Sequence, residues 1–195
     1  EELFKKLGFK TVEELLQEFN GLVIIDEAYI DFSGKESWLS RLQQYPNLVI
    51  TQTLSKAYGM AGIRLGICCA SREIIDILKK IKPPYNVNQL TQQRALNRIL
   101  DVENVKAEVA DILEGRDQLF KVLMEVSYVE KIYPSDANFI LVQVDDATAR
   151  YNQLIEKGIV IRNRSTQPLC ENTLRFTVGT TQENEKLIAA LKSLT

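Results

Sequence analysis

The chain has 195 residues, of which 45% are hydrophobic and 26% charged, with a net charge of −2 and no histidine. This composition fits an ordinary globular protein of one or two domains, and so small a charge gives no electrostatic reason to expect a nucleic-acid partner. Without histidine, Ser-His-Asp and Cys-His nucleophilic mechanisms are excluded, and we expect no metal site.

A helix and three strands are predicted in the first part of the chain. Residues 11–19 place apolar side chains on one helical face, with Thr11 as N-cap. The wholly apolar run 22–25 fits a strand covered on both faces, as in a parallel sheet, and 48–52 repeats this signal. A third strand, 65–70, follows after a connection too short for a parallel crossover, so we expect it to run antiparallel.

The three cysteines bear on the cellular compartment. Cys68 and Cys69 are adjacent inside the third apolar run, and Cys170 is the only other one. An odd count of this kind predicts buried thiols in a reducing compartment rather than a disulfide framework. No apolar run approaches the roughly 20 residues that span a bilayer, and the N-terminal residues lack the charge order and apolar core of a signal peptide. We therefore expect a cytoplasmic protein.

The rest of the chain is predicted to mix helices with short strands. Helices are expected at 73–80, 88–100 and 103–125, and the last is long enough to link two domains. Beyond it we expect strands at 128–133, at 138–144, near Val160 and at 174–178, and helices at 148–157 and 182–193. Strands and helices mixed in this way are typical of a small α/β or α+β domain.

Four chemically distinctive side chains follow the predicted strands of the first part. Asp26 ends the first apolar run and Tyr29 comes three residues later; Lys56 follows the second run, and Arg64 precedes the third. A lysine can hold an aldehyde as a Schiff base, and an acid can keep a pyridine nitrogen protonated. A phenol can bond a ring oxygen, and an arginine with hydroxyls can hold a phosphate. These are the groups that bind pyridoxal 5′-phosphate (PLP).

Five segments of the chain resemble one known family in the family's order and with closely matching spacing. From residue 21 to about residue 179 the chain resembles the C-terminal half of the histidinol-phosphate aminotransferases, which are fold-type I PLP enzymes. The segments are 26–32, 53–66, 137–139, 158–162 and 174–179. The resemblance implies an α/β fold. Residues 1–103 would be part of the PLP-dependent transferase large domain, a mixed, mostly parallel sheet with helices, and 104–195 the C-terminal small α/β domain.

The resemblance assigns three residues to the reactive part of the cofactor. Lys56 would form the Schiff base and move the proton at the substrate's Cα, Asp26 would hold the pyridine nitrogen protonated, and Tyr29 would lie near the phenolic oxygen. Taken alone, each has an ordinary alternative: a solvent-exposed loop lysine, an acid at a strand end, and an aromatic ring packed beside the sheet.

A second group resembles the site that holds the cofactor's phosphate. Thr53, Ser55 and Arg64 supply two hydroxyls and a planar guanidinium, which suit a dianion. The alternative is that the hydroxyls belong to ordinary turn residues and that the arginine lies on the surface.

Three residues of the second part are implied to contact the substrate. Arg175 stands between two apolar residues and would be buried, and lone buried arginines are rare. By resemblance it holds the phosphate of histidinol phosphate in one half-reaction and a carboxylate of glutamate or 2-oxoglutarate in the other. Arg162 would assist on the phosphate and Asn138 would lie near the substrate, although an asparagine between strands is commonly structural.

The family implies a ping-pong aminotransferase of histidine biosynthesis, which moves an amino group between L-histidinol phosphate and 2-oxoglutarate in a homodimer. The motifs that the family carries before residue 21 are missing here. We therefore expect a fragment that is inactive by itself. Two alternatives stay open: a related PLP enzyme acting on another phosphorylated or aromatic amino substrate, such as a threonine-phosphate decarboxylase, and a non-catalytic fragment that serves as an interaction module.

Overall fold

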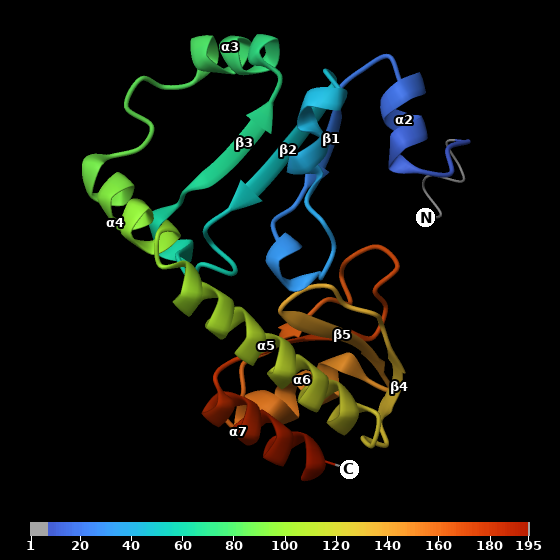
Figure 1. The fold of residues 1–195 in the computed structure, drawn as a ribbon. Helices are drawn as coiled ribbons and strands as arrows, with labels where there is room; N and C mark the ends of the chain where they lie inside the picture. Colours follow the sequence, from blue (N-terminus) through green and yellow to red (C-terminus); the bar gives the residue numbers. More distant parts are fainter. Residues whose placement is uncertain (1–7, 195) are drawn as a thin grey trace. The chain divides into compact units, whose positions relative to one another are not determined.

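The computed structural model describes residues 8–194, which form two compact units (Figure 1). Unit 1 contains residues 8–30 and Gly34–Val102, and unit 2 contains Asp31–Ser33 and residues 103–194. The predicted assignment of residues 1–103 to a large domain and 104–195 to a small domain stays a prediction, and its two ends lie outside the described residues. Within 8–194, no helix combines the length and the apolar character needed to cross a bilayer.

Unit 1 is built on a three-stranded sheet in the order β1-β2-β3 (Figure 1). β1 (Val23–Asp26) runs parallel to β2 (Leu48–Thr53), and β3 (Gly66–Ala70) runs antiparallel to β2, which confirms the predicted direction of the third strand. Helix α2 (Val12–Glu18) begins at the predicted N-cap, since the Thr11 hydroxyl accepts a hydrogen bond from the N–H of Glu14 at 3.1 Å.

The other elements of unit 1 are helical. η2 (Trp38–Gln44) and η3 (Ala61–Ile63) are 3-10 helices, and η1 (Ile30–Phe32) begins where the chain leaves unit 1. The predicted helices at 73–80 and 88–100 are α3 (Arg72–Ile81) and α4 (Gln89–Ile99), with boundaries within one residue of the prediction. Side chains of α2 and η2 pack with one face of the sheet in a single core, whose buried members are Leu16, Val23, Tyr45, Leu48 and Ile50.

Two expectations about this sheet are wrong for the described residues. β1 is not covered on both faces: α2 and η2 pack on the side of Val23, whereas Ile24 points the other way and is 65% exposed. The thiols are not all buried either, because adjacent strand residues point to opposite faces. Cys69 packs against the core and burial raises the pKa of its thiol, whereas Cys68 is exposed.

Unit 2 is a four-stranded antiparallel sheet with helices on one face (Figure 1). Its strands lie in the order β4-β5-β7-β6 and comprise β4 (Val129–Ile132), β5 (Phe139–Val144), β6 (Arg162–Asn163) and β7 (Thr173–Thr177). The helices are α5 (Val102–Leu123), α6 (Ala147–Glu156) and α7 (Thr181–Lys192), and all three contribute to the core. The short strand expected near Val160 is β6, which begins at Arg162, and Val160 itself is 77% exposed.

Strand alternation gives the sheet of unit 2 two unlike faces. On β5, Ile140 and Val142 enter the core, and on β7 Leu174 and Phe176 do the same. The residues between them therefore point to the opposite face of the sheet. Arg175 is one of these, so the fold places it away from the apolar core in which a charged side chain would be costly.

Candidate active site

The predicted cofactor residues converge at one edge of the sheet of unit 1. Because β1 and β2 are parallel and Asp26 pairs with Thr51, both strands end at this edge. β3 runs the other way, so Gly66 at its start pairs with Thr53 at the end of β2. We call this the carboxyl edge. In α/β sheets, ligands bind beyond the carboxyl ends of the strands.

Asp26 is held in a fixed direction at the end of β1. Its Oδ1 accepts a hydrogen bond from the Thr51 hydroxyl at 3.2 Å and another from the N–H of Ala28 at 3.1 Å. Within the described part of the chain, no group donates to its Oδ2. The carboxylate is thus oriented by its own sheet while it keeps one oxygen for a ligand.

Lys56 lies in a tight turn that is held in place by buried apolar residues on both sides. Leu54 and Ala57 are buried on either side of it, and the N–H of Gly59 bonds the carbonyl of Lys56 at 2.9 Å. Gly59 has φ +66°, a conformation that glycine adopts without strain. The Lys56 ammonium lies 5.0 Å from the centroid of the Tyr29 ring, so two predicted residues from different strand ends meet here.

The hydroxyls predicted to hold a phosphate are adjacent. Thr53 Oγ1 donates to Ser55 Oγ at 2.9 Å and accepts a hydrogen bond from the N–H of Ser55 at 3.1 Å. Arg64 follows η3 with φ +55°, which is unusual for a residue with a Cβ, and its Nη1 donates to the carbonyl of Ala61 at 3.0 Å. Its side chain is exposed, and it precedes β3 on the same edge of the sheet as the two hydroxyls.

One polar residue beside this edge was missed in the sequence analysis. Glu27 is only 5% exposed, and its carboxylate accepts hydrogen bonds from the Ser37 hydroxyl at 2.6 Å, the Trp38 N–H at 2.7 Å and the Gln52 amide at 2.9 Å. These bonds tie the segment after Asp26 to β2 and to the start of η2. The sole signal in the sequence is a second acid directly after Asp26.

The two arginines predicted to bind the substrate are neighbours in unit 2. Arg162 on β6 and Arg175 on β7 are paired across the strands, and neither forms an ion pair with a described residue. Arg175 is half-buried, and its Nε is buried with no hydrogen-bond acceptor. Like charges directly opposite each other repel, and an anion between them would remove that cost. The pair is therefore suited to bind an oxoanion.

The hydrogen bond that the structure shows for Asn138 is made by its backbone. Asn138 precedes β5, and its carbonyl accepts a hydrogen bond from the N–H of Val178 at 2.9 Å. Its predicted contact with substrate remains a prediction. The six cofactor candidates thus belong to unit 1, whereas Asn138, Arg162 and Arg175 belong to unit 2.

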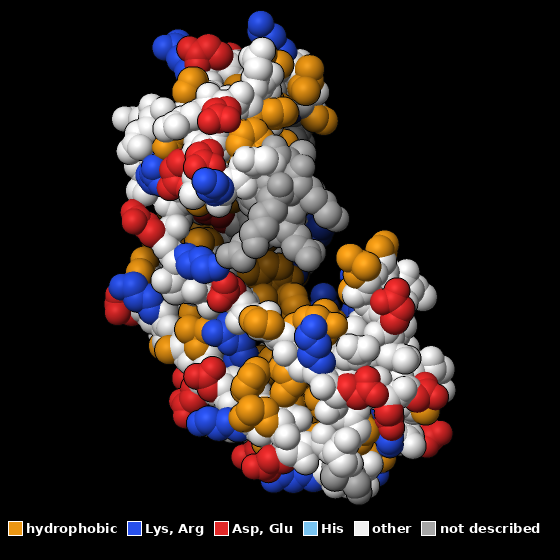
Figure 2. Space-filling model, turned by 90° about the vertical axis from the view of Figure 1, so that its right-hand side faces the viewer, with side chains coloured by type: hydrophobic (Ala, Val, Ile, Leu, Met, Phe, Trp, Pro, Cys, Tyr) orange, Lys and Arg blue, Asp and Glu red, His pale blue; other side chains and the backbone are white. Residues whose placement is uncertain are grey.

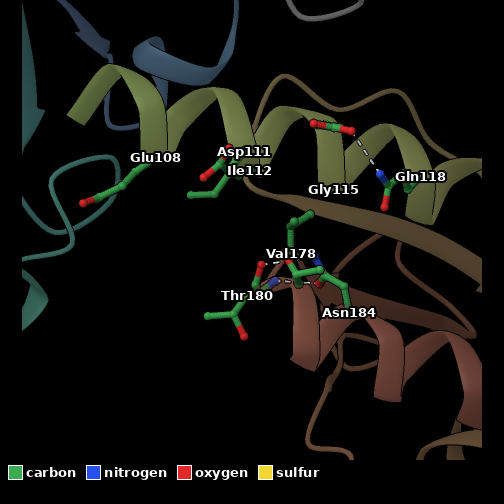
Figure 3. Close-up of a pocket in the computed structure, with 11 residues that line it drawn as sticks. Glu108, Asp111, Ile112, Gly115, Gln118, Val178, Thr180 and Asn184 are labelled. Atoms are coloured by element: carbon green, nitrogen blue, oxygen red, sulfur yellow. Dashed lines mark hydrogen bonds between the residues drawn. The ribbon is translucent and has the colours of Figure 1, made fainter. Parts of the chain in front are cut away.

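Each unit also contains a cavity. In unit 1, a cavity of about 560 Å³ is lined by Arg64 together with Asn86, Asn88 and Arg94 at the start of α4. In unit 2, a cavity of about 590 Å³ lies between α5 and the start of α7 and contains none of the predicted site residues (Figure 3).

The polar residues that line the cavity of unit 2 do not indicate a site for the predicted cofactor or substrate. The buried Asn184 bonds both the N–H and the carbonyl of Gly179, at 2.9 and 3.1 Å, and so fixes the turn before α7 (Figure 3). The opposite wall on α5 carries the acids Glu108, Asp111 and Glu114. A wall of acids would repel the anionic cofactor and substrate predicted above.

Comparisons with known proteins find related sequences over nearly the whole chain. The family model for class I and II aminotransferases matches residues 4–191. The histidinol-phosphate aminotransferase of Flavobacterium johnsoniae is 68% identical over 185 residues, which cover 95% of this chain and 53% of the relative. The chain thus spans about half the length of the curated relatives that it matches.

Solved structures share the fold. The crystal structure of the histidinol-phosphate aminotransferase from Clostridium acetobutylicum matches with a TM-score of 0.87 at 26% identity, over 96% of this chain and 60% of that one. The enzyme from Sinorhizobium meliloti, solved in complex with pyridoxal-5′-phosphate, matches with a TM-score of 0.79 at 24% identity, over 89% of this chain and 50% of that one. The predicted α/β fold and the resemblance to histidinol-phosphate aminotransferases are confirmed. Because the family model covers nearly the whole sequence, the chain belongs to the aminotransferase class I and II family.

Proposed function

We propose that the chain takes part in PLP-dependent transfer of an amino group between L-histidinol phosphate and 2-oxoglutarate, a step of histidine biosynthesis. The observation that carries the proposal is the carboxyl edge of unit 1, where Lys56 lies against Tyr29 and Asp26 is oriented by Thr51. The relatives named histidinol-phosphate aminotransferase support the choice of substrate.

The donor set at the carboxyl edge fits PLP. Asp26 keeps one carboxylate oxygen for the ring nitrogen, Lys56 offers an amine to the aldehyde, and Tyr29 places a phenol beside that amine. Thr53, Ser55 and Arg64 supply hydroxyl and guanidinium donors for the phosphate. When bound, the cofactor supplies an electron sink that stabilises negative charge at the substrate's Cα.

The protein's own groups would orient the substrate and move its proton. The amine of Lys56 can accept the proton from the substrate's Cα and return it. The buried side chains of Leu54 and Ala57 fix the turn that positions this amine. Arg175 and Arg162 would bind the phosphate or carboxylate of the substrate, with Asn138 beside them. Holding the substrate by its anionic end would restrict its orientation for the proton transfer.

The proposal includes a cytoplasmic homodimer, with residues 1–103 as part of the large domain and 104–195 as the small domain. Hydrophobic side chains reach the surface among charged ones (Figure 2). Those on the helices of unit 1 with more than half of their surface exposed are Ile77, Ile81, Leu90 and Leu96. Exposed apolar area of this kind is available for burial against a partner chain.

The first test is covalent labelling of Lys56. The chain is incubated with PLP, reduced with borohydride and mapped by peptide mass spectrometry. We expect one adduct, on Lys56, and its loss in Lys56→Arg. The matched control is Lys79→Arg, which changes an exposed helical lysine and should label like the wild type.

Two results bear directly on the proposal. Labelling spread evenly over surface lysines would contradict a PLP site at Lys56. If labelling is specific, the chain is incubated with PLP without borohydride. Amino transfer from histidinol phosphate and CO₂ release from threonine phosphate are then measured. Faster CO₂ release would replace the aminotransferase with the alternative decarboxylase.

A further inference from the structure

Phe139 is an aromatic residue on the same face of the unit 2 sheet as the two arginines. β5 alternates between the core, which receives Ile140 and Val142, and the opposite face, which receives Phe139 and Leu141. Its ring is therefore not part of the apolar core and is only half-buried. Its contacts are therefore made on the face that also carries Arg175.

The strand register brings this ring to Arg175. Phe139 pairs with Thr177, two residues along β7 from Arg175, so the two side chains are diagonal neighbours across the strands. Diagonal pairs are about 7–8 Å apart at their Cα atoms, a gap that only aromatic and long side chains bridge. Here they do: the guanidinium carbon of Arg175 lies 4.9 Å from the centroid of the Phe139 ring.

The contact with the ring occupies none of the N–H donors of Arg175. A ring stacked on a guanidinium attracts its positive charge through the π face but accepts none of the N–H groups, which lie in the guanidinium plane. In the described part of the chain, Arg175 has no carboxylate partner, and its Nε is buried with no acceptor. Arg162 stands directly opposite, and its charge would push a freely moving guanidinium away.

We propose that Phe139 is a positioning residue for anion binding: its ring holds the guanidinium of Arg175 in place beside Arg162, with the N–H edge free to bind a phosphate or carboxylate. This rests on the proposed function insofar as the anion is the substrate's charged group. Without the ring, Arg175 would sample several rotamers, and binding an anion would require ordering a flexible side chain.

The test measures the affinity of the chain for inorganic phosphate by NMR, from the change in chemical shift of the Arg175 Nε–H as phosphate is added. The Nε–H signal is assigned by its absence in Arg175→Lys. In Phe139→Leu we expect phosphate affinity to fall about five- to twenty-fold, the size of a partly desolvated cation–π contact. The ring-current shift at Nε–H should disappear as well. Phe139→Tyr and Phe139→Trp keep a π face and should retain both the shift and most of the affinity.

A matched control exists in the same unit. Tyr133 forms a similar contact with Lys131, 4.6 Å from ring centroid to ammonium, and β5 separates it from the strands that carry the two arginines. Tyr133→Leu should leave phosphate binding unchanged, and thermal unfolding of all variants reports any loss of fold. Comparable loss of affinity in Tyr133→Leu and Phe139→Leu would mean a general structural effect and would overturn the inference.

Two further outcomes would also overturn it: unchanged phosphate affinity in Phe139→Leu, or no response of Arg175 to phosphate in the wild type. Neither depends on PLP. The amino-transfer proposal is decided separately, by labelling of Lys56, so the two ideas can fail independently.

Discussion

Glu27 and Asp26 are adjacent acids with opposite environments. Asp26 is exposed at the end of β1, whereas Glu27 is buried and accepts three hydrogen bonds from Ser37, Trp38 and Gln52. Since neighbouring strand residues face opposite sides, one acid can serve a ligand while the next fixes the loop that follows. We infer that Glu27 stabilises the conformation in which Asp26 and Tyr29 reach the carboxyl edge.

This role predicts a large effect of a single substitution. Glu27→Ala would leave the Ser37, Trp38 and Gln52 donors without their acceptor, and we expect unfolding free energy to fall by about 2–4 kcal/mol. Urea denaturation measures it. Glu36→Ala, in the same loop but exposed, is the control and should change stability by less than about 0.5 kcal/mol. Equal effects of the two variants would contradict the inference.

At the residue scale, site candidates could be predicted where a charged residue stands beside an apolar strand, and could not where a contact depends on strand register. Lys56, Asp26 and Arg64 stand out because each is a charged residue next to an apolar strand. Glu27 and Phe139 do not stand out: an acid beside an acid and an aromatic at a strand start are ordinary. Their partners, Gln52 and Arg175, lie on strands that are distant in the sequence, and only the observed strand pairing shows that they are in contact.

At the scale of elements, boundaries followed from capping and periodicity where both were strong. α2 begins after Thr11 and α4 after Asn88, each with a side chain that accepts an N–H of the first turn. The bounds of β6 could not be predicted, because a strand of two residues is too short for a period to show. The coverage of β1 was misjudged because an apolar run indicates burial without showing which elements cover each face.

The N-terminus of α7 yields a pH-dependent prediction. The Glu183 carboxylate accepts hydrogen bonds from the backbone N–H and the hydroxyl of Thr180, at 2.8 and 2.9 Å, in a reciprocal capping box. The backbone hydrogen bond first, and the hydroxyl second, lower the pKa of Glu183 below its usual 4.5. A depressed pKa contributes stability above the unfolded value, and this stability is lost as pH falls through the folded value.

Glu183→Ala should therefore lower the unfolding free energy by about 1 kcal/mol at pH 7 and by less near pH 3, because lowering the pH neutralises the carboxylate that accepts the two hydrogen bonds. Urea denaturation at the two pH values measures this. Glu185→Ala removes an exposed acid from the same helix and controls for net charge and helix propensity. A loss that is equal at both pH values would argue against a charge-dependent cap.

At the scale of the whole molecule, the apolar surface left exposed is as informative as the core. The core face of the unit 1 sheet is closed by α2 and η2, but the opposite face presents Leu22 and Ile24 to solvent, 55% and 65% exposed. Among the described residues, β1 is also an edge strand, because β2 is the one strand that it pairs with. Exposed apolar edges promote pairing with another chain unless charge or proline blocks them.

This surface predicts self-association of the chain. Burying a side chain such as Ile24 is worth roughly 1.5–3 kcal/mol, enough to shift a weak monomer–dimer equilibrium by one to two orders of magnitude. In sedimentation equilibrium, we expect the apparent mass to rise with concentration for the wild type and to stay near the monomer for Ile24→Lys. Leu169→Lys adds the same charge at an apolar residue that is 88% exposed in the loop between β6 and β7. It should associate like the wild type. A chain that remains monomeric at every concentration, or two variants that behave alike, would show that the open sheet face of unit 1 does not drive association.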